Sequence, residues 1–100
     1  MTPEVGKLYR HKKGTLYRVI AIASYNENPS EYTSSFWVAH VETSCVIEIY
    51  LFDDGHAEHK FTDGGTLIAY QDTEHPAKKW GRSEQVFSDG RFVEEGDRND

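Results

Sequence analysis

The chain has 100 residues, of which 37% are apolar and 28% are charged, and it carries a net charge of −6. This length predicts one domain over residues 1–100 with a single modest core. No apolar run approaches the roughly 20 residues that span a bilayer and no apolar signal segment is visible, so we expect a cytoplasmic protein without membrane contact. The lone cysteine, Cys45, lies in the apolar run CVIEIYLF and is predicted to be buried.

Positive charge is concentrated at the start of the chain. Residues 1–20 contain five of the eleven Lys and Arg residues and one acid, so they carry +4, and residues 21–100 carry −10. Such asymmetry is typical of an interaction surface. It is equally expected by chance in a small acidic protein with one basic hairpin, and the sequence leaves both explanations open.

The first predicted element is a β-hairpin that turns at Lys12-Lys13-Gly14. A three-residue loop needs a positive φ at its last position, which glycine supplies. The predicted pairs are Leu8–Arg18, Tyr9–Tyr17 and His11–Thr15. One side then presents Tyr9, His11, Tyr17 and Val19, and the other presents Leu8, Arg10, Leu16, Arg18, Ile20 and Ile22. A two-residue loop would exchange the faces of one strand, and we prefer the longer loop because it places the aliphatic side chains together.

The middle of the chain predicts a surface loop followed by strands. Residues 24–35 are polar and contain Pro29, as in a loop, whereas the runs 36–42 and 44–52 are rich in β-forming residues. A second glycine-closed turn occupies residues 53–55. Pairing around it places Ile47, Ile49, Leu51, Ala57, His59 and Phe61 on one face and Glu48, Tyr50, Glu58 and Lys60 on the other, with Glu48 opposite Lys60.

The last third predicts two strands and a helical turn. Residues 62–65 turn the chain into strands at 66–72 and 78–82, and residues 83–88 form one helical turn with Ser83 as N-cap and Gly90 beyond its end. Residues 94–100 form a polar acidic tail that we expect to be flexible. Six or seven short strands predict a mainly β fold, either an antiparallel barrel or a strongly bent sheet.

The residues give no support for catalysis. His56 and His59, together with His40, suggest a metal site, but positions i and i+3 of a strand point to opposite faces. We therefore expect His59 inside the protein and His56 at the turn. No nucleophile elbow is present, and Asp53 and Asp54 lie on a turn, where water solvates them. We expect no enzyme activity, no metal and no cofactor.

The segment YRHKKGTLYRVIAIAS resembles the opening of a small bacterial and phage domain family of unknown function, with the signature Tyr-Arg-His-x-Lys-Gly followed by Tyr and Val. LIAYQD, KKWGR and EQVFSDGRF are similar to its later blocks through Tyr70, Trp80, Arg82 and Phe87. The resemblance covers residues 6–24 and 66–93 and leaves 25–65 as an insertion, and the proline expected after Arg82 is missing. It implies a bacterial or phage source and an SH3-like barrel, to which residues 36–61 add a β-hairpin extension, and it implies no chemistry.

Eight residues are candidate contacts with a partner: Tyr9, Arg10, His11, Lys12, Lys13, Tyr17, Trp80 and Arg82. They combine cations with flat aromatic rings, as anion-binding and nucleic-acid-binding surfaces do. If the two blocks lie side by side, the rings and cations line one groove. Alternatively, Tyr9, Tyr17 and Trp80 fill the core with Phe87, and Arg10 pairs with an acid. The second arrangement is favoured, because aromatic rings do most of the burying in a small core.

We expect a non-catalytic binding module, an accessory protein of a phage or mobile element that engages a host protein, as a monomer or weak homodimer. The acidic net charge and a β extension with an exposed edge favour a protein partner. The alternative is a nucleic-acid or nucleotide binder that uses the basic aromatic hairpin 9–18.

Overall fold

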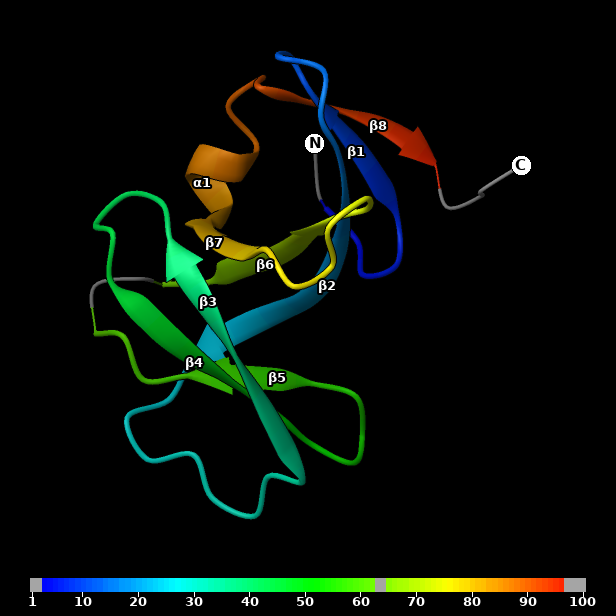
Figure 1. Cartoon of the computed structure of the whole chain (residues 1–100). Helices are drawn as coiled ribbons and strands as arrows, with labels where there is room; N and C mark the ends of the chain where they lie inside the picture. Colours follow the sequence, from blue (N-terminus) through cyan, green and yellow to red (C-terminus); the bar gives the residue numbers. More distant parts are fainter. Residues whose placement is uncertain (1–2, 63–64, 97–100) are drawn as a thin grey trace.

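The computed structural model describes residues 3–62 and 65–96, which form eight strands and one short helix (Figure 1). The elements in chain order are β1 (Leu8–His11), β2 (Leu16–Tyr25), β3 (Ser34–His40), β4 (Val46–Leu51), β5 (Ala57–His59), β6 (Leu67–Asp72), β7 (Lys79–Ser83), α1 (Glu84–Phe87) and β8 (Phe92–Gly96). The strands are short, as the dense turn signals of the sequence predict.

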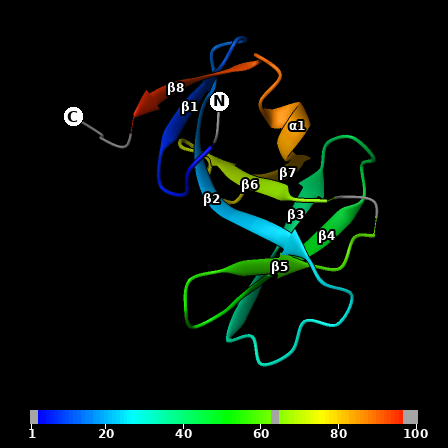
Figure 2. The ribbon, with the colours of Figure 1, turned by 180° about the vertical axis from the view of Figure 1, so that it is seen from behind.

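Six of the strands close into a barrel. Their order is β5-β4-β3-β7-β6-β2, and β5 closes the ring by pairing with the end of β2, where Ala57 lies opposite Ala23. β1 and β8 continue the sheet outside the ring, from β2. Figure 1 and, from behind, Figure 2 show β1, β8 and α1 together at one end of the molecule and β3, β4 and β5 at the other.

The prediction of a mainly β barrel with extra strands and one short helix is confirmed. The division of the strands between the barrel and its extension differs from the expectation, however. Residues 36–61, predicted as an extension, supply β4, β5 and most of β3, and the strands outside the ring are β1 and β8. Two contacts in the ring, β2–β5 and β3–β7, are parallel rather than antiparallel. The physical reason is burial, because β3, β4 and β5 cover an apolar face that β2 and β6 would otherwise expose to water.

The register of the first hairpin is confirmed. Its pairs are Leu8–Arg18, Tyr9–Tyr17 and Arg10–Leu16, and Gly14 has a φ of 107° at the last position of the turn. The side that faces the core is the aromatic side, because Tyr9 and Val19 are fully buried. On the other side Leu8 is buried, whereas the remaining aliphatic side chains are only partly buried: Leu16, Ile20 and Ile22.

Two apolar clusters lie on opposite sides of β6. The cluster inside the barrel is made of small and aliphatic side chains: Ala21, Ala23, Val38, Ile47, Ile49, Ala57, Leu67 and Ala69. The cluster under β1, β8 and α1 is mainly aromatic: Tyr9, Val19, Ile68, Tyr70, Phe87 and Phe92. β6 contributes alternate residues to the two clusters, as the pleat of a strand requires. It is therefore a central strand covered on both faces, and the candidate site lies at the edge of the aromatic cluster.

The β4–β5 hairpin has the predicted turn, with the pairs Tyr50–Glu58 and Leu51–Ala57. His59 is fully buried and His56 is exposed, as expected. The His59 Nε2–H donates to the Gly65 carbonyl, its Nδ1 accepts from the Phe61 N–H over 3.0 Å, and burial lowers its pKa. Lys60 does not form the expected cross-strand ion pair among the described residues, because its Nζ lies 5.7 Å above the Tyr50 ring instead.

The prediction for Cys45 is wrong, because this side chain is exposed. Ser44 has a positive φ of 65° and reverses the chain between β3 and β4. The turn is held by the His40 N–H, which donates to the Cys45 carbonyl over 2.7 Å. Cys45 therefore belongs to the turn, and the apolar strand begins one residue later, at Val46.

The C-terminal part of the structure agrees with the prediction from the sequence except at the tail. Ser83 is the N-cap of α1, and its Oγ accepts from the Val86 N–H over 3.3 Å. Residues 94–96, predicted as the start of a flexible tail, pair with β1 as part of β8, and residues 97–100 lie outside the described part. No helix within residues 3–62 and 65–96 has the length and apolar character needed to cross a bilayer.

Candidate functional site

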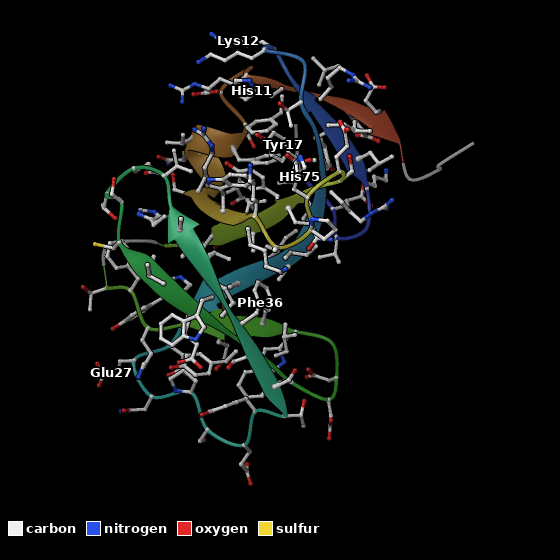
Figure 3. The ribbon with its side chains drawn as sticks, viewed as in Figure 1. His11, Lys12, Tyr17, Glu27, Phe36 and His75 are labelled. Atoms are coloured by element: carbon white, nitrogen blue, oxygen red, sulfur yellow. The ribbon has the colours of Figure 1, made fainter. Side chains whose placement is uncertain are left out.

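A concave site opens between the β1–β2 hairpin, β6, β7 and β8. Its volume is about 260 Å³, and it is lined by His11, Lys13, Thr15, Tyr17, Val41, Tyr70, Trp80, Arg82 and Phe92. We call it the cationic pocket. It brings together five of the eight residues that the sequence proposed as contacts: His11, Lys13, Tyr17, Trp80 and Arg82. Figure 3 shows His11 and Lys12 at the hairpin end of the molecule, with Tyr17 below them.

Four aromatic rings form the wall of the cationic pocket. Tyr17 on β2 contacts Tyr70 on β6 at a centroid distance of 5.1 Å and Trp80 on β7 at 5.6 Å, edge to face in both cases. Tyr70 and Trp80 are direct partners in the sheet, and Phe92 on β8 lies 5.9 Å from Tyr17. The four rings thus pack against one another in edge-to-face contacts, while Tyr17 and Trp80 remain partly exposed.

Arg82 lies at the base of this wall and is only 9% exposed. Its Nε–H donates to the Tyr70 hydroxyl oxygen over 2.7 Å, and the guanidinium carbon is 5.6 Å from the Phe92 centroid. Burial raises the pKa of Tyr70 to about 12, although Arg82 acts in the opposite direction, so the hydroxyl is neutral at pH 7. The Nη1 group of Arg82 is buried and has no hydrogen-bond partner within the described residues. An unsatisfied buried charged donor costs free energy that a bound acceptor would recover.

His11 forms the rim of the cationic pocket. Its ring stands edge-on to Phe92 at 5.1 Å, and its Nδ1 accepts from the Lys13 backbone N–H over 3.1 Å. The pKa of His11 is lowered first by burial and then by the positive charges of Arg82, Lys13, Lys12 and Arg91. The neighbouring cations act in the same direction as burial, but burial is the larger cause. The neutral ring carries its hydrogen on Nε2, because Nδ1 is occupied as an acceptor.

The remaining candidates lie outside the cationic pocket. The Tyr9 ring is fully buried, packs edge-on against Phe87 at 5.4 Å and accepts a hydrogen bond from the Glu4 N–H. It therefore belongs to the core and cannot touch a partner, which corrects its place in the predicted set. Arg10 points away, donating to the Gly14 carbonyl over 2.8 Å and pairing with Glu95 at 3.4 Å. Lys12 is exposed at the hairpin tip.

Three cations near the cationic pocket are already paired with acids. Lys7 pairs with Glu4 and Glu94, Arg10 pairs with Glu95, and Arg91 pairs with Asp89. Within the described residues, Lys12, Lys13 and Arg82 form no ion pair. Positive charge without an ion pair therefore lies in the pocket, on Lys13 and Arg82, and at the adjoining hairpin tip, on Lys12.

Sequence reasoning missed four lining residues: Thr15, Val41, Tyr70 and Phe92. Tyr70 could have been found, because it lies in an apolar strand next to the run that contains Trp80. Val41 carried no signal, since it reaches the cationic pocket only because β3 and β7 pair in parallel, with the Val41 N–H donating to the Gly81 carbonyl over 3.0 Å.

Comparison with protein-family models, curated proteins and solved structures found no match to this chain. The family resemblance of residues 6–24 and 66–93 therefore stays a prediction. The function must be argued from the site alone.

Proposed function

We propose that the protein is a non-catalytic binding module that holds one carboxylate group of a protein partner in the cationic pocket. The observation that carries the proposal is the buried Arg82 guanidinium, whose Nη1 lacks an acceptor among the described residues. A carboxylate accepts from a guanidinium with two parallel bonds and neutralises it. Arg82 lines the pocket and supplies the charge that such a group needs, and a small shift of its guanidinium would bring the buried Nη1 donor to the carboxylate.

The size of the cationic pocket limits what enters it. About 260 Å³ is less than the roughly 300–1,000 Å³ of sites that enclose whole small molecules. A single side chain or a chain terminus fits this space better than a complete cofactor does. Tyr17 and Trp80 would then contact the apolar part of the bound residue, while Arg82 and Lys13 meet its carboxylate.

A protein partner is favoured over nucleic acid by the distribution of charge. Nucleic-acid backbones require a track of free cations, whereas Lys7, Arg10 and Arg91 are paired with acids. The net charge of −6 also opposes approach of a polyanion. The origin of the partner in a host cell remains a prediction from the family resemblance.

A binding role is favoured over catalysis because His11 activates no nucleophile in this arrangement. Its Nδ1 accepts from a backbone N–H, and no hydrogen bond within residues 3–62 and 65–96 joins its ring to the hydroxyl of Thr15 or Tyr17. General-base activation needs such a contact.

The test is a titration of ¹⁵N-labelled protein with N-acetylphenylalanine, whose carboxylate is free, and with its neutral amide. We expect the carboxylate to shift the Trp80 indole resonance and the amide to leave it unchanged. N-acetylaspartate amide, with its carboxylate on the side chain, distinguishes an acidic side chain from a chain terminus. Arg82→Gln should weaken carboxylate binding at least tenfold, as expected for a charge-assisted bidentate pair.

Lys60→Gln is the matched control, because it removes a cation from the far side of the barrel and should leave binding unchanged. If Arg82→Gln does not fold, Lys13→Gln replaces it, since this exposed side chain is dispensable for packing. The proposal is refuted if acid and amide bind equally. Binding of single-stranded oligothymidylate in preference to both carboxylates would instead establish the nucleic-acid alternative.

A further inference from the structure

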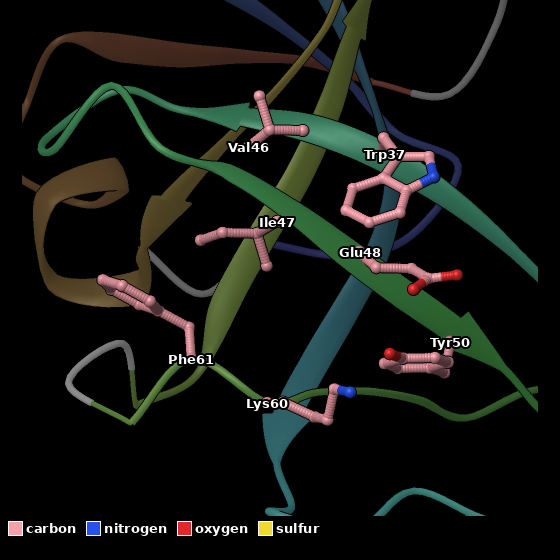
Figure 4. A pocket seen from close by; sticks show the side chains of 7 residues that line it. All are labelled: Trp37, Val46, Ile47, Glu48, Tyr50, Lys60 and Phe61. Carbon is pink, nitrogen blue, oxygen red and sulfur yellow. The ribbon is translucent and has the colours of Figure 1, made fainter.

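The outer face of β3 and β4 carries a second, chemically opposite site. Trp37 is 58% exposed and Val46 is 66% exposed, although both lie in strands. A hollow of about 240 Å³ beside them is lined by Trp37, Val46, Ile47, Glu48, Tyr50, Lys60 and Phe61 (Figure 4). We call it the Trp37 face. An exposed indole with an apolar hollow beside it is typical of a contact surface.

We infer that the Trp37 face is a docking site for a segment of a partner protein that carries an arginine or a lysine. The first argument is charge. Residues 26–62 contain seven acids and one base, so they carry −6, whereas the rest of the chain contains ten acids and ten bases and is neutral. Within the described residues, none of these seven acids forms an ion pair with Lys or Arg. The acidic excess of the chain is thus carried by the segment that includes β3 and β4, although Glu48 is the one of these acids that lines the hollow. Figure 3 shows Glu27, another acid of this segment, at the end of the molecule opposite Lys12.

The second argument is the indole itself. Trp is the strongest cation–π acceptor among the side chains, and within the described residues no ring or cation lies against Trp37. The same face already holds one cation in this way, because Lys60 lies 5.7 Å above the Tyr50 ring. Trp37 offers an equivalent ring that is 58% exposed and that no described aromatic ring or cation contacts.

The third argument is the carboxylate beside the indole. Trp37 and Glu48 are direct cross-strand partners, and Figure 4 shows the Glu48 carboxylate between the Trp37 and Tyr50 rings. One of its oxygens accepts from the Ser35 hydroxyl over 2.6 Å, which orients the group. A guanidinium or ammonium lying on the indole therefore reaches a positioned carboxylate.

The apolar part of the hollow completes the match. Val46, Ile47 and Phe61 line its other side. The methylene stem of an arginine or lysine side chain buries against such surfaces while its charged end stays at the rim. The Trp37 face therefore matches each part of such a side chain. The apolar hollow contacts the methylene stem, the indole ring contacts the cation, and the Glu48 carboxylate accepts from its N–H donors.

The experiment titrates ¹⁵N-labelled protein with a blocked five-residue glycine peptide that carries two arginines. The same peptide with citrulline in place of arginine tests charge, because citrulline keeps the shape and loses the charge. A blocked pentaproline tests for a neutral polyproline ligand. The two tryptophan indole resonances separate the sites, since Trp37 reports this face and Trp80 reports the cationic pocket.

We expect the arginine peptide to shift the Trp37 indole resonance and not that of Trp80, with neither neutral peptide binding. Trp37→Leu and Glu48→Gln should each weaken binding about fivefold. Glu84→Gln removes an exposed acid elsewhere and should have no effect. Arg82→Gln should also leave arginine binding unchanged, so failure of the carboxylate proposal would not affect this one.

Three results would overturn the inference. Equal binding of the citrulline or pentaproline peptide would show that charge does not select the ligand. A shift at Trp80 alone would place the peptide elsewhere. A Trp37 resonance that moves on simple dilution, together with a lower sedimentation coefficient for Trp37→Leu, would identify a second copy of this chain as the occupant.

Discussion

Gly81 lies between Trp80 and Arg82 of the cationic pocket, and its substitution by alanine tests how closely β7 approaches β3. A Cβ built on Gly81 would lie 3.0 Å from the Val38 Cγ2, and the backbone there does not have a positive φ. Carbon atoms in contact prefer separations of about 3.5–4.0 Å. Val38 is 1% exposed and packs within the apolar cluster inside the barrel. Gly81→Ala is therefore an overpacking substitution.

We expect Gly81→Ala to lower the free energy of unfolding by about 1–2 kcal/mol. Overpacking costs about 1–3 kcal/mol, and replacing glycine offsets this by about 0.4–1 kcal/mol through the entropy of the unfolded chain. Each kcal/mol corresponds to roughly 4–8 °C in Tm for a domain of this size. Urea unfolding followed by circular dichroism measures the difference.

The double variant Val38→Ala with Gly81→Ala is the decisive control. Val38→Ala alone should cost about 2–3 kcal/mol, from two methyl groups at about 0.8 kcal/mol each and the cavity that they leave. In the double variant the new methyl group enters that cavity, so the combined loss should be smaller than the sum by about 1 kcal/mol. Additive losses, or a Gly81→Ala variant more stable than the parent, would refute the argument that Val38 confines this position.

Three further predictions concern the hairpin and α1. Because the pKa of His11 is lower in the folded state than its unfolded value of about 6.5, the unfolded state binds more protons. The free energy of unfolding should therefore fall as the pH drops below about 6.5, and His11→Gln should have a shallower fall in a pH series of urea titrations. Ser83→Ala removes the N-cap of α1 and should cost about 0.5–2 kcal/mol by the same assay, with Gln85→Ala, at an exposed position of the same helix, as the unaffected comparison. Lys12→Glu with Lys13→Glu should change stability by about 0.5 kcal/mol or less, and carboxylate binding should weaken and depend less steeply on salt. Binding that is unchanged across a salt series would show that the tip charges act only on solubility.

Local chemistry in the sequence determined the turns and the registers. Gly14 and Gly55 permit the positive φ that their three-residue turns require, and these turns fix which residues face each other in both hairpins. Ser83 determined the start of α1, and this signal is also local, because a side-chain cap acts over three residues. The mainly β class followed from these signals, because each is local and needs no knowledge of distant strands.

Only the tertiary structure decided which face of each strand is the core and how the barrel closes. The side chains of the β1–β2 hairpin alternate between its two faces as the sequence predicts. The aromatic face is the buried one because α1 and β8 fold over it, and these contacts join residues more than seventy positions apart. The parallel β2–β5 and β3–β7 contacts join strands whose pairing leaves no local pattern. The cationic pocket depends on both arrangements: proximity in sequence grouped the cations of residues 10–13, but only closure of the barrel brought Arg82 beneath them and left its Nη1 without a described partner.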